Sequence, residues 1–193
     1  MIDIAQNAPH TLILTEDEAG IYLQASLERV WAVRGQTPIV RQHAGRDSTH
    51  FYGTLNLNTG QETVMRSKIM TSEATALHLD QVLAAYPDQS ILLIWDRAPW
   101  HFGDAVNATL AAHPRLEVMY YPAASPDLNP QEHVWKDARH HVTHNHDMNS
   151  LNALADAVEA YLVSHRFPCS LLHTLGYHAI LDLTSAHTYC RQL

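Results

Sequence analysis

The sequence predicts an α/β protein in which a mixed β-sheet is flanked by helices. Residues 50–57 and 61–66 read as two strands around Asn58-Thr59-Gly60, a hairpin signal, so the first part is antiparallel. From residue 79 onward, helix-spaced apolar residues alternate with short strand-like runs. Residues 90–95 are apolar throughout, as in a parallel-sheet strand that helices cover on both faces. An antiparallel meander followed by helix–strand alternation gives a mixed, layered sheet.

The remaining elements follow from the same patterns. We expect strands at 11–15, one or two within 21–33, and at 50–57, 61–66, 90–95 and 116–121. Helices are expected around 79–86, at 104–113 before Pro114, at about 130–141, along 151–162, and at 170–175 ending at Gly176. No internal repeat or linker is visible, so residues 1–193 are predicted to form a single domain.

Composition narrows the class of protein. The chain has 193 residues and is 46% hydrophobic, enough for one sizeable core. No apolar run reaches the roughly 18 residues of a membrane span, and the N-terminus has no secretory pattern, so we expect a cytoplasmic protein. Cys169 and Cys190 have neither zinc nor redox spacing. We expect two reduced thiols, with a single disulfide as the alternative.

The net charge of −8 counts against a stand-alone nucleic-acid binder, because affinity for phosphates comes from clustered Lys and Arg. Either the basic surface is local or another segment supplies most of the DNA affinity. The 15 histidines would shift this balance in mild acid.

Three carboxylates occupy positions that suit a metal-dependent nuclease. Asp17 and Asp96 follow apolar runs of strand length, and Glu132 follows a proline-rich turn that leads into a helix. If strands 11–15 and 90–95 pair in parallel, about 4.8 Å apart, both aspartates leave the same sheet edge and could share a metal. Two metal ions held by three carboxylates can activate water and stabilise a leaving oxygen in phosphodiester cleavage.

Each carboxylate also has a structural alternative. An aspartate often ends a strand and begins a turn. Asn129 is a good N-cap, Pro130 suits the first helical position, and Glu132 would complete a capping box. A glycosidase with two carboxylates is a further alternative, although no aromatic cluster for sugar stacking accompanies them.

Two further segments of the sequence are Trp95-Asp96-Arg97-Ala98-Pro99-Trp100-His101 and Tyr121-Pro122-Ala123-Ala124-Ser125-Pro126-Asp127-Leu128-Asn129-Pro130-Gln131-Glu132-His133-Val134-Trp135. Both resemble the DDE-superfamily transposases of bacterial insertion sequences, most closely the mariner-like branch. The stretches 17–21 and 31–38 also match that pattern, and the similarity covers roughly residues 11–165. The block at 125–132 is its most specific part.

The resemblance implies a specific fold and chemistry. It implies an RNase H-like, five-stranded mixed sheet and two Mg²⁺ ions, with Mn²⁺ as a substitute. It also implies cleavage and joining of double-stranded DNA at transposon ends, by a homodimer assembled on DNA near the bacterial nucleoid. The family's first and second aspartates map to Asp17 and Asp96, and its final acidic residue maps to Glu132.

Two departures from the family matter. Arg97 stands where the family often has Asn, and could alter hydrogen bonds around the metal ligands or contact a phosphate. The family's usual N-terminal helix-turn-helix region is not found, so we expect a catalytic half that works with a separate helix-turn-helix subunit, or a truncated remnant. The alternative function is a catalytically silent protein that binds DNA or a full-length transposase.

Neighbouring polar residues have supporting roles to be tested. His101 is expected to orient the loop after Asp96 or contact a phosphate, the alternative being a partly buried histidine bonded to backbone. Asn129 could support a metal ligand or contact DNA. Glu16 and Glu18 flank Asp17 on a strand and should face away from the metals.

Other residues with possible chemistry have plainer explanations. Trp100 and Trp135 are expected to pack in the core or a loop rather than stack on bases. His140, His141, His144 and His146 suggest zinc, since His140 and His144 share a helix face. No Cys or second ligand pair accompanies them, so the default is a solvated helix end.

Overall fold

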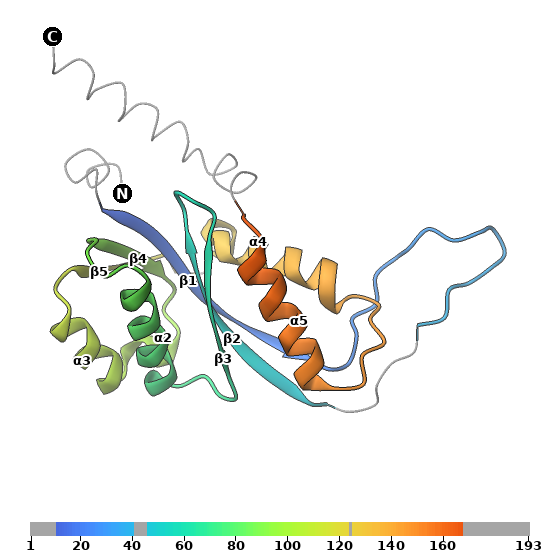
Figure 1. Ribbon diagram of the computed structural model, residues 1–193, viewed down its shortest axis with the longest axis horizontal. Helices are drawn as coiled ribbons and strands as arrows, with labels where there is room; N and C mark the ends of the chain where they lie inside the picture. The colour runs from blue at the N-terminus through green and yellow to red at the C-terminus, as the bar shows by residue number, and fades with distance from the viewer. Residues whose placement is uncertain (1–10, 41–45, 124, 168–193) are drawn as a thin grey trace, which may run out of the picture.

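The computed structural model describes residues 11–40, 46–123 and 125–167 (Figure 1). Five strands form one sheet in the order β3-β2-β1-β4-β5. Their bounds are β1 Leu12–Tyr22, β2 Ser48–Asn56, β3 Glu62–Ser67, β4 Ile91–Trp95 and β5 Leu116–Tyr120. The first three strands pair antiparallel, whereas β4 is parallel to both β1 and β5. The predicted mixed sheet is therefore confirmed.

Helices cover both faces of the sheet (Figure 1). They are α2 Ser72–Ala85, α3 Asp104–Ala112, α4 Pro130–Ala138 and α5 Leu151–Ser164, with short 3-10 turns η1 Pro99–Phe102 and η2 Pro126–Leu128 and a π-helix η3 Arg139–Thr143. Helices α2 and α3 lie on one face, and α4 and α5 lie on the other. Within the described ranges, none of these helices combines the length and apolar composition needed to cross a membrane.

The core is divided by the sheet into two layers. Strand β4 contributes Leu92 and Ile94 to the layer under α4 and α5, and Leu93 and Trp95 to the layer under α2 and α3. This two-sided burial explains why β4 reads as a continuous apolar run. Strand β4 ends at Trp95, so Asp96 is the first residue after it.

Strand β1 is longer than the predicted 11–15, and Asp17 lies inside it rather than after its end. Strand β4 pairs with β1 only from Leu12 to Thr15, but β2 pairs with it from Leu14 to Tyr22. Because the antiparallel partner continues where the parallel one stops, the backbone around Asp17 stays extended. The side chain of Asp17 is thereby held by a strand and not by a turn.

The prediction of further strands at 21–33 is wrong beyond Tyr22, where β1 ends. Ser26 makes an isolated bridge with His144, and residues 27–33 form no strand. Their apolar side chains, such as Trp31 and Val33, are exposed, so apolar content there did not indicate a buried strand. In Figure 1 the segment extends away from the sheet beyond α5.

The predicted helix at 130–141 is present in a modified form. It is α-helical to Ala138 and continues as the π-helix to Thr143. The hairpin and the helices at 104–113 and 151–162 are confirmed. The helix expected at 170–175 with its end at Gly176, and both cysteines, Cys169 and Cys190, lie outside the described residues.

Candidate active site

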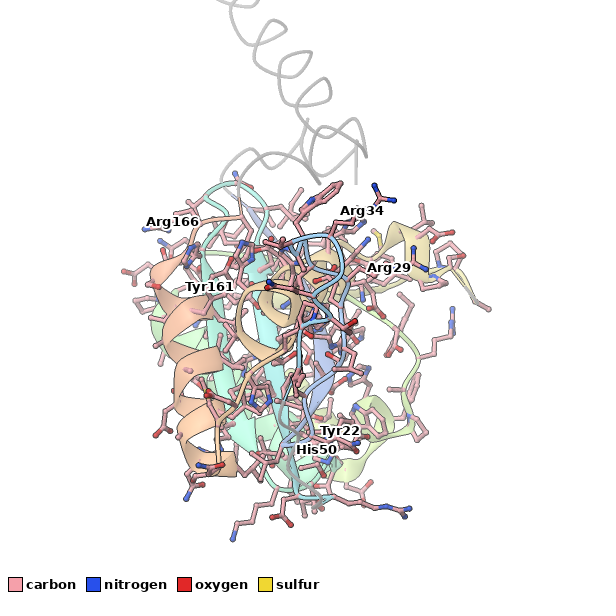
Figure 2. All side chains as sticks on the ribbon, turned by 90° about the vertical axis from the view of Figure 1, so that its right-hand side faces the viewer. Tyr22, Arg29, Arg34, His50, Tyr161 and Arg166 are labelled. Atoms are coloured by element: carbon pink, nitrogen blue, oxygen red, sulfur yellow. The ribbon has the colours of Figure 1, made fainter. Side chains whose placement is uncertain are left out.

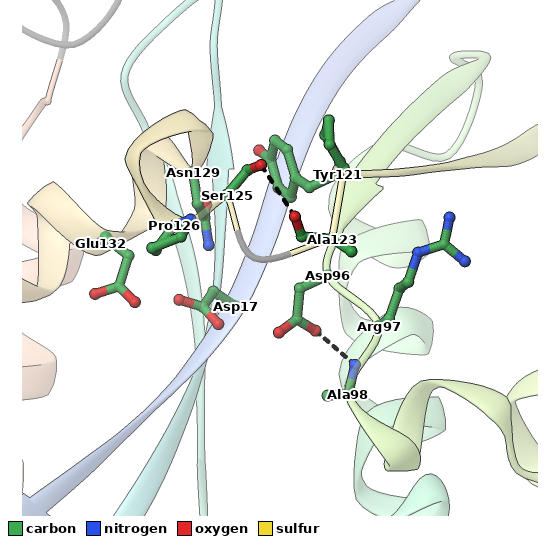
Figure 3. A pocket seen from close by; sticks show the side chains of 11 residues that line it. Asp17, Asp96, Arg97, Ala98, Tyr121, Ala123, Ser125, Pro126, Asn129 and Glu132 are labelled. Atoms are coloured by element: carbon green, nitrogen blue, oxygen red, sulfur yellow. Dashed lines mark hydrogen bonds between the residues drawn. The ribbon is translucent and has the colours of Figure 1, made fainter.

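Asp17, Asp96 and Glu132 line one pocket, which lies at the C-terminal end of the interior strand β4 (Figure 3). Asp17 comes from β1, Asp96 directly follows β4, and Glu132 lies in the first turn of α4. In the parallel pairing, Thr15 is the partner of Ile94, so Asp17 and Asp96 each lie two residues beyond that pair. The expected convergence of the two strand carboxylates is thus a consequence of register.

The pKa of the Asp17 carboxyl group is higher than that of an ordinary aspartate. Burial and the neighbouring negative charge of Glu18 raise the pKa of Asp17 to about 7, and the charges of Glu132 and Asp96 act in the same direction. Raised carboxyl pKa values result when several carboxylates share a site. The pocket therefore concentrates negative charge that a bound cation would neutralise.

Asp96 is held in a fixed orientation by two donors. Its Oδ1 accepts a 2.8 Å hydrogen bond from the backbone N–H of Ala98, drawn in Figure 3, and lies 3.2 Å from His101 Nδ1. The hydrogen bond with His101 is the main reason that the pKa of Asp96 is below its usual value. The carboxylate is therefore ionised and oriented, and neither contact uses its Oδ2.

The His101 side chain is buried and contacts three carboxylates. Besides Asp96, its Nε2 lies 3.3 Å from Glu16 Oε2 and 3.1 Å from Glu18 Oε1, and its ring stacks on Trp95 at 4.3 Å between centroids. Burial alone would lower the pKa of His101, but hydrogen bonds to Asp96, Glu16 and Glu18 outweigh it and raise the pKa to about 12. A fully enclosed ring has no surface to offer to a phosphate in this conformation.

Glu16 and Glu18 do not line the pocket, which agrees with the alternation predicted for β1. Burial and the charge of Glu18 raise the pKa of Glu16 to about 8. Trp100 donates from Nε1 to Glu18 Oε1 at 2.5 Å, and Trp135 is buried in the core. Both tryptophans pack as expected.

Asn129 is the N-cap of α4. Its Oδ1 accepts from the backbone N–H of Gln131 at 3.1 Å, and Pro130 occupies the first turn, as predicted. The backbone N–H of Asn129 donates instead to Pro126 O at 2.9 Å, so the capping box considered for Glu132 is not formed. Glu132 is exposed and free to face the pocket.

A buried hydroxyl network, which no sequence pattern predicts, links β1 to this helix start. Thr15 Oγ1 lies 2.5 Å from Tyr121 OH and donates to Asn129 Oδ1 at 3.2 Å. The partners are 106 and 114 residues from Thr15 in the chain, too far for any local pattern to connect them. The network fixes Asp17's strand relative to Glu132's helix.

Arg97 lines the same pocket but does not approach the acids. Its guanidinium carbon lies 5.1 Å from the centre of the Tyr120 ring. Figure 3 shows the group directed away from Asp17 and Glu132. It therefore places a positive charge at the border of an acidic pocket.

Comparison with known proteins gives the family. The profile described as DDE superfamily endonuclease matches residues 13–155. An insertion element IS630 uncharacterized 39 kDa protein of Shigella sonnei is 26% identical over 151 residues, 78% of this chain and 44% of that protein. The uncharacterized protein y4pE/y4sA of Sinorhizobium fredii (strain NBRC 101917 / NGR234) is 35% identical over 69 residues, 35% of this chain and 48% of that protein. The chain spans about half the length of these relatives.

Solved structures share the fold. The Mos1 transposase paired-end complex with left transposon end has a TM-score of 0.65 at 16% identity, covering 95% of this chain and 56% of that one. The catalytic domain of Mos1 mariner transposase gives 0.59 at 15% identity over 95% of this chain and 84% of that one. The mariner Mos1 paired end complex with Mg gives 0.62 at 17% identity, covering 90% and 53%. These similarities confirm the RNase H-like arrangement, and the matching profile shows that the chain belongs to the DDE superfamily endonucleases.

Proposed function

We propose that this chain is the catalytic domain of a DDE transposase, which cleaves DNA at insertion-element ends and joins the strands to target DNA. The observation that carries the proposal is the pocket lined by Asp17, Asp96 and Glu132, which come from three separate elements. The IS630 relative and the Mos1 complexes with transposon ends support DNA as the substrate.

We propose that these carboxylates hold two Mg²⁺ ions, with Mn²⁺ as a substitute. The residues fit such ions, because all three ligands are carboxylate oxygens, which hard cations prefer. Burial and the neighbouring carboxylates raise the pKa of Asp17, and a cation bound there would offset both effects. When bound, such cations activate an attacking water or hydroxyl and stabilise the departing oxygen.

The surrounding residues would keep the carboxylates in place. Ala98 N–H and His101 hold one oxygen of Asp96, which leaves the other for a ligand. Thr15 and Asn129 keep the start of α4, and with it Glu132, against β1. Arg97, at the border of the pocket, would contact a DNA phosphate.

We further propose that double-stranded DNA is recognised with help from a separate helix-turn-helix subunit, and that the enzyme acts as a homodimer on DNA. The net charge of −8 supports a helix-turn-helix partner, since few phosphates can be neutralised by this chain alone. Fluorescence anisotropy on end-containing and scrambled duplexes, at one salt concentration, would test it. Tight and end-selective binding by the isolated chain would contradict it.

The catalytic proposal is tested by two readouts on the same protein. Mn²⁺ binding, followed by electron paramagnetic resonance, should require Asp96. Nicking of an end-containing duplex in Mg²⁺, with a helix-turn-helix partner fused or mixed in, should vanish in Asp96→Asn. Asp127→Asn is the matched control, because Asp127 is an exposed carboxylate in the neighbouring turn that does not line this pocket. Equal Mn²⁺ binding by Asp96→Asn would refute the metal site. Normal Mn²⁺ binding with no cleavage of any DNA would favour the catalytically silent alternative.

A further inference from the structure

A second group of ligand-type side chains lies at the far end of α4, away from the acidic pocket. His140 Nδ1 lies 2.8 Å from Glu28 Oε2, and His144 Nδ1 lies 2.7 Å from the same oxygen. The three ligand atoms all lie within 4.8 Å of one another. Two imidazole nitrogens and one carboxylate oxygen therefore converge on one point.

The backbone around this group is fixed from both sides. The side chain of Asn145 accepts from the Glu28 N–H at 3.1 Å and donates to the Glu28 carbonyl at 3.1 Å. The backbone N–H of Asn145 donates to Ser26 O at 3.0 Å. Residues 26–28 are thereby attached to the chain that follows the π-helix, although the two segments are more than a hundred residues apart.

The π-helix itself changes where the second histidine lies. The N–H of His144 donates to Arg139 O, five residues earlier, at 2.9 Å. The wider turn alters the relative direction of His140 and His144 from that in an α-helix, and their rings are nearly perpendicular at 87°. Single π-turns inside helices are frequently associated with functional sites.

We propose that Glu28, His140 and His144 bind a transition-metal dication, with Zn²⁺ as the ion of choice. Two histidines and one carboxylate form a recognised zinc ligand set, completed by water in the fourth position. All three side chains are partly exposed, so an ion can enter. Binding would replace the hydrogen bonds that the two imidazole nitrogens now make with Glu28. Mg²⁺ would not compete, because it prefers oxygen ligands.

The bound ion would tie the segment that follows β1 to the end of α4. Asp17 lies within β1, which leads into this segment, and Glu132 lies in the first turn of α4, which leads into the π-helix. Arg29 directly follows the ligand Glu28, and Arg34 lies further along the same exposed segment (Figure 2). Zn²⁺ should therefore slow trypsin cleavage after Arg29 more than cleavage after Arg34.

Binding can be measured on the untagged 193-residue chain, independently of any DNA cleavage. Co²⁺ serves as a spectroscopic probe, and Zn²⁺ is measured by competition with a chromophoric chelator. We expect the intense visible bands of tetrahedral Co²⁺ in the wild type. Glu28→Gln and His144→Gln should each lose at least about tenfold in affinity, since even outer partners of metal ligands cost that much.

The control is His141→Gln, the neighbouring histidine whose Nδ1 contacts Asp137 O and Tyr161 OH rather than Glu28. It should keep the wild-type affinity, the cobalt bands and the trypsin protection after Arg29. Equal metal affinity in all of these variants would place the ion at other histidines and overturn the proposal. Failure of the wild type to compete with a chelator of micromolar affinity would also overturn it.

Discussion

The imidazole of His101 joins Asp96 at the pocket to two buried carboxylates. Its Nδ1 lies 3.2 Å from Asp96 Oδ1, and its Nε2 lies 3.3 Å and 3.1 Å from oxygens of Glu16 and Glu18. The contacts with these acceptors raise the pKa of His101 enough to keep the ring protonated at neutral pH. The protonated ring thus lies beside three carboxyl groups and fixes the direction of Asp96.

We expect His101→Gln to weaken Mn²⁺ binding by about 10- to 100-fold, the range seen when the support of a metal ligand is lost. The glutamine has no charge and leaves Glu16 and Glu18 without a cationic partner. Removal of one partner from a buried ion pair costs about 3–5 kcal/mol, so folding must be verified by circular dichroism at the assay temperature. The measurement is a Mn²⁺ titration, together with the Mg²⁺ dependence of nicking.

Trp100→Phe is the control for that variant. It removes the indole donor to Glu18 but leaves the contact between His101 and Asp96 in place. Metal affinity should stay at the wild-type level. If both variants weaken binding equally, His101 contributes through general stability and not through Asp96.

The hydroxyl network predicts an effect of Thr15→Val. Valine has the same shape as threonine but cannot bond to Tyr121 or Asn129, so two buried polar groups lose a partner. Each such loss costs about 1–3 kcal/mol, and we expect the free energy of unfolding to fall by that order. Urea denaturation measures it, and Mn²⁺ affinity should fall as well, because α4 is less firmly held against β1.

Thr49→Val separates these two effects. Thr49 donates to Ser67 O between β2 and β3 and has no contact with the pocket. It should lower stability without changing Mn²⁺ affinity. Unchanged affinity in Thr15→Val would show that the network supports folding alone.

The sequence predicted those parts of the fold that local patterns determine. The hairpin between β2 and β3, the apolar strand β4 and the N-cap Asn129 all depend on neighbouring residues, and all are present. The extension of β1 through Asp17 was missed, because it depends on pairing with β2 across a long intervening segment. The exposed apolar residues after Tyr22 were mistaken for strands because periodicity does not reveal the absence of a partner strand.

The site was predictable only in its outline. Apolar runs and the family motif indicated Asp17, Asp96 and Glu132, which line one pocket. The contact of Glu28 with His140 and His144 joins residues that are more than a hundred positions apart. Such contacts come from the packing of the whole chain, which no spacing rule contains.

The helix start provides a test that separates catalysis from capping. Glu132→Gln keeps the length of the side chain, and the cap interactions belong to Asn129, so the free energy of unfolding should change by less than about 1 kcal/mol. Nicking in Mg²⁺ should vanish. Asn129→Ala should instead lower stability by about 0.5–2 kcal/mol. A Glu132→Gln protein that cleaves normally and merely melts earlier would exclude Glu132 from the proposed metal site.

Glu62 offers a prediction about pH. It is buried on β3, its Oε1 accepts from Gln131 Nε2, and its Oε2 has no partner in the part of the chain that the structure describes. Burial raises the pKa of Glu62 well above its ordinary value. The folded protein therefore retains a proton that the unfolded chain releases above about pH 4.5, so this group's contribution to stability falls as pH rises.

We expect Glu62→Gln to remove that loss. Relative to wild type, its free energy of unfolding should increase as the pH rises above about 5, by at most about 1.4 kcal/mol for each pH unit, until the pH reaches the raised pKa of Glu62. The amide that replaces Oε2 has no partner either, which lowers stability by a constant amount, so the slope and not the offset is the test. Urea denaturation at several pH values measures it. Glu117→Gln, at an exposed position on β5, should run parallel to wild type. A parallel curve for Glu62→Gln would mean that Glu62 is already ionised in the folded protein, with a cation or water beside it.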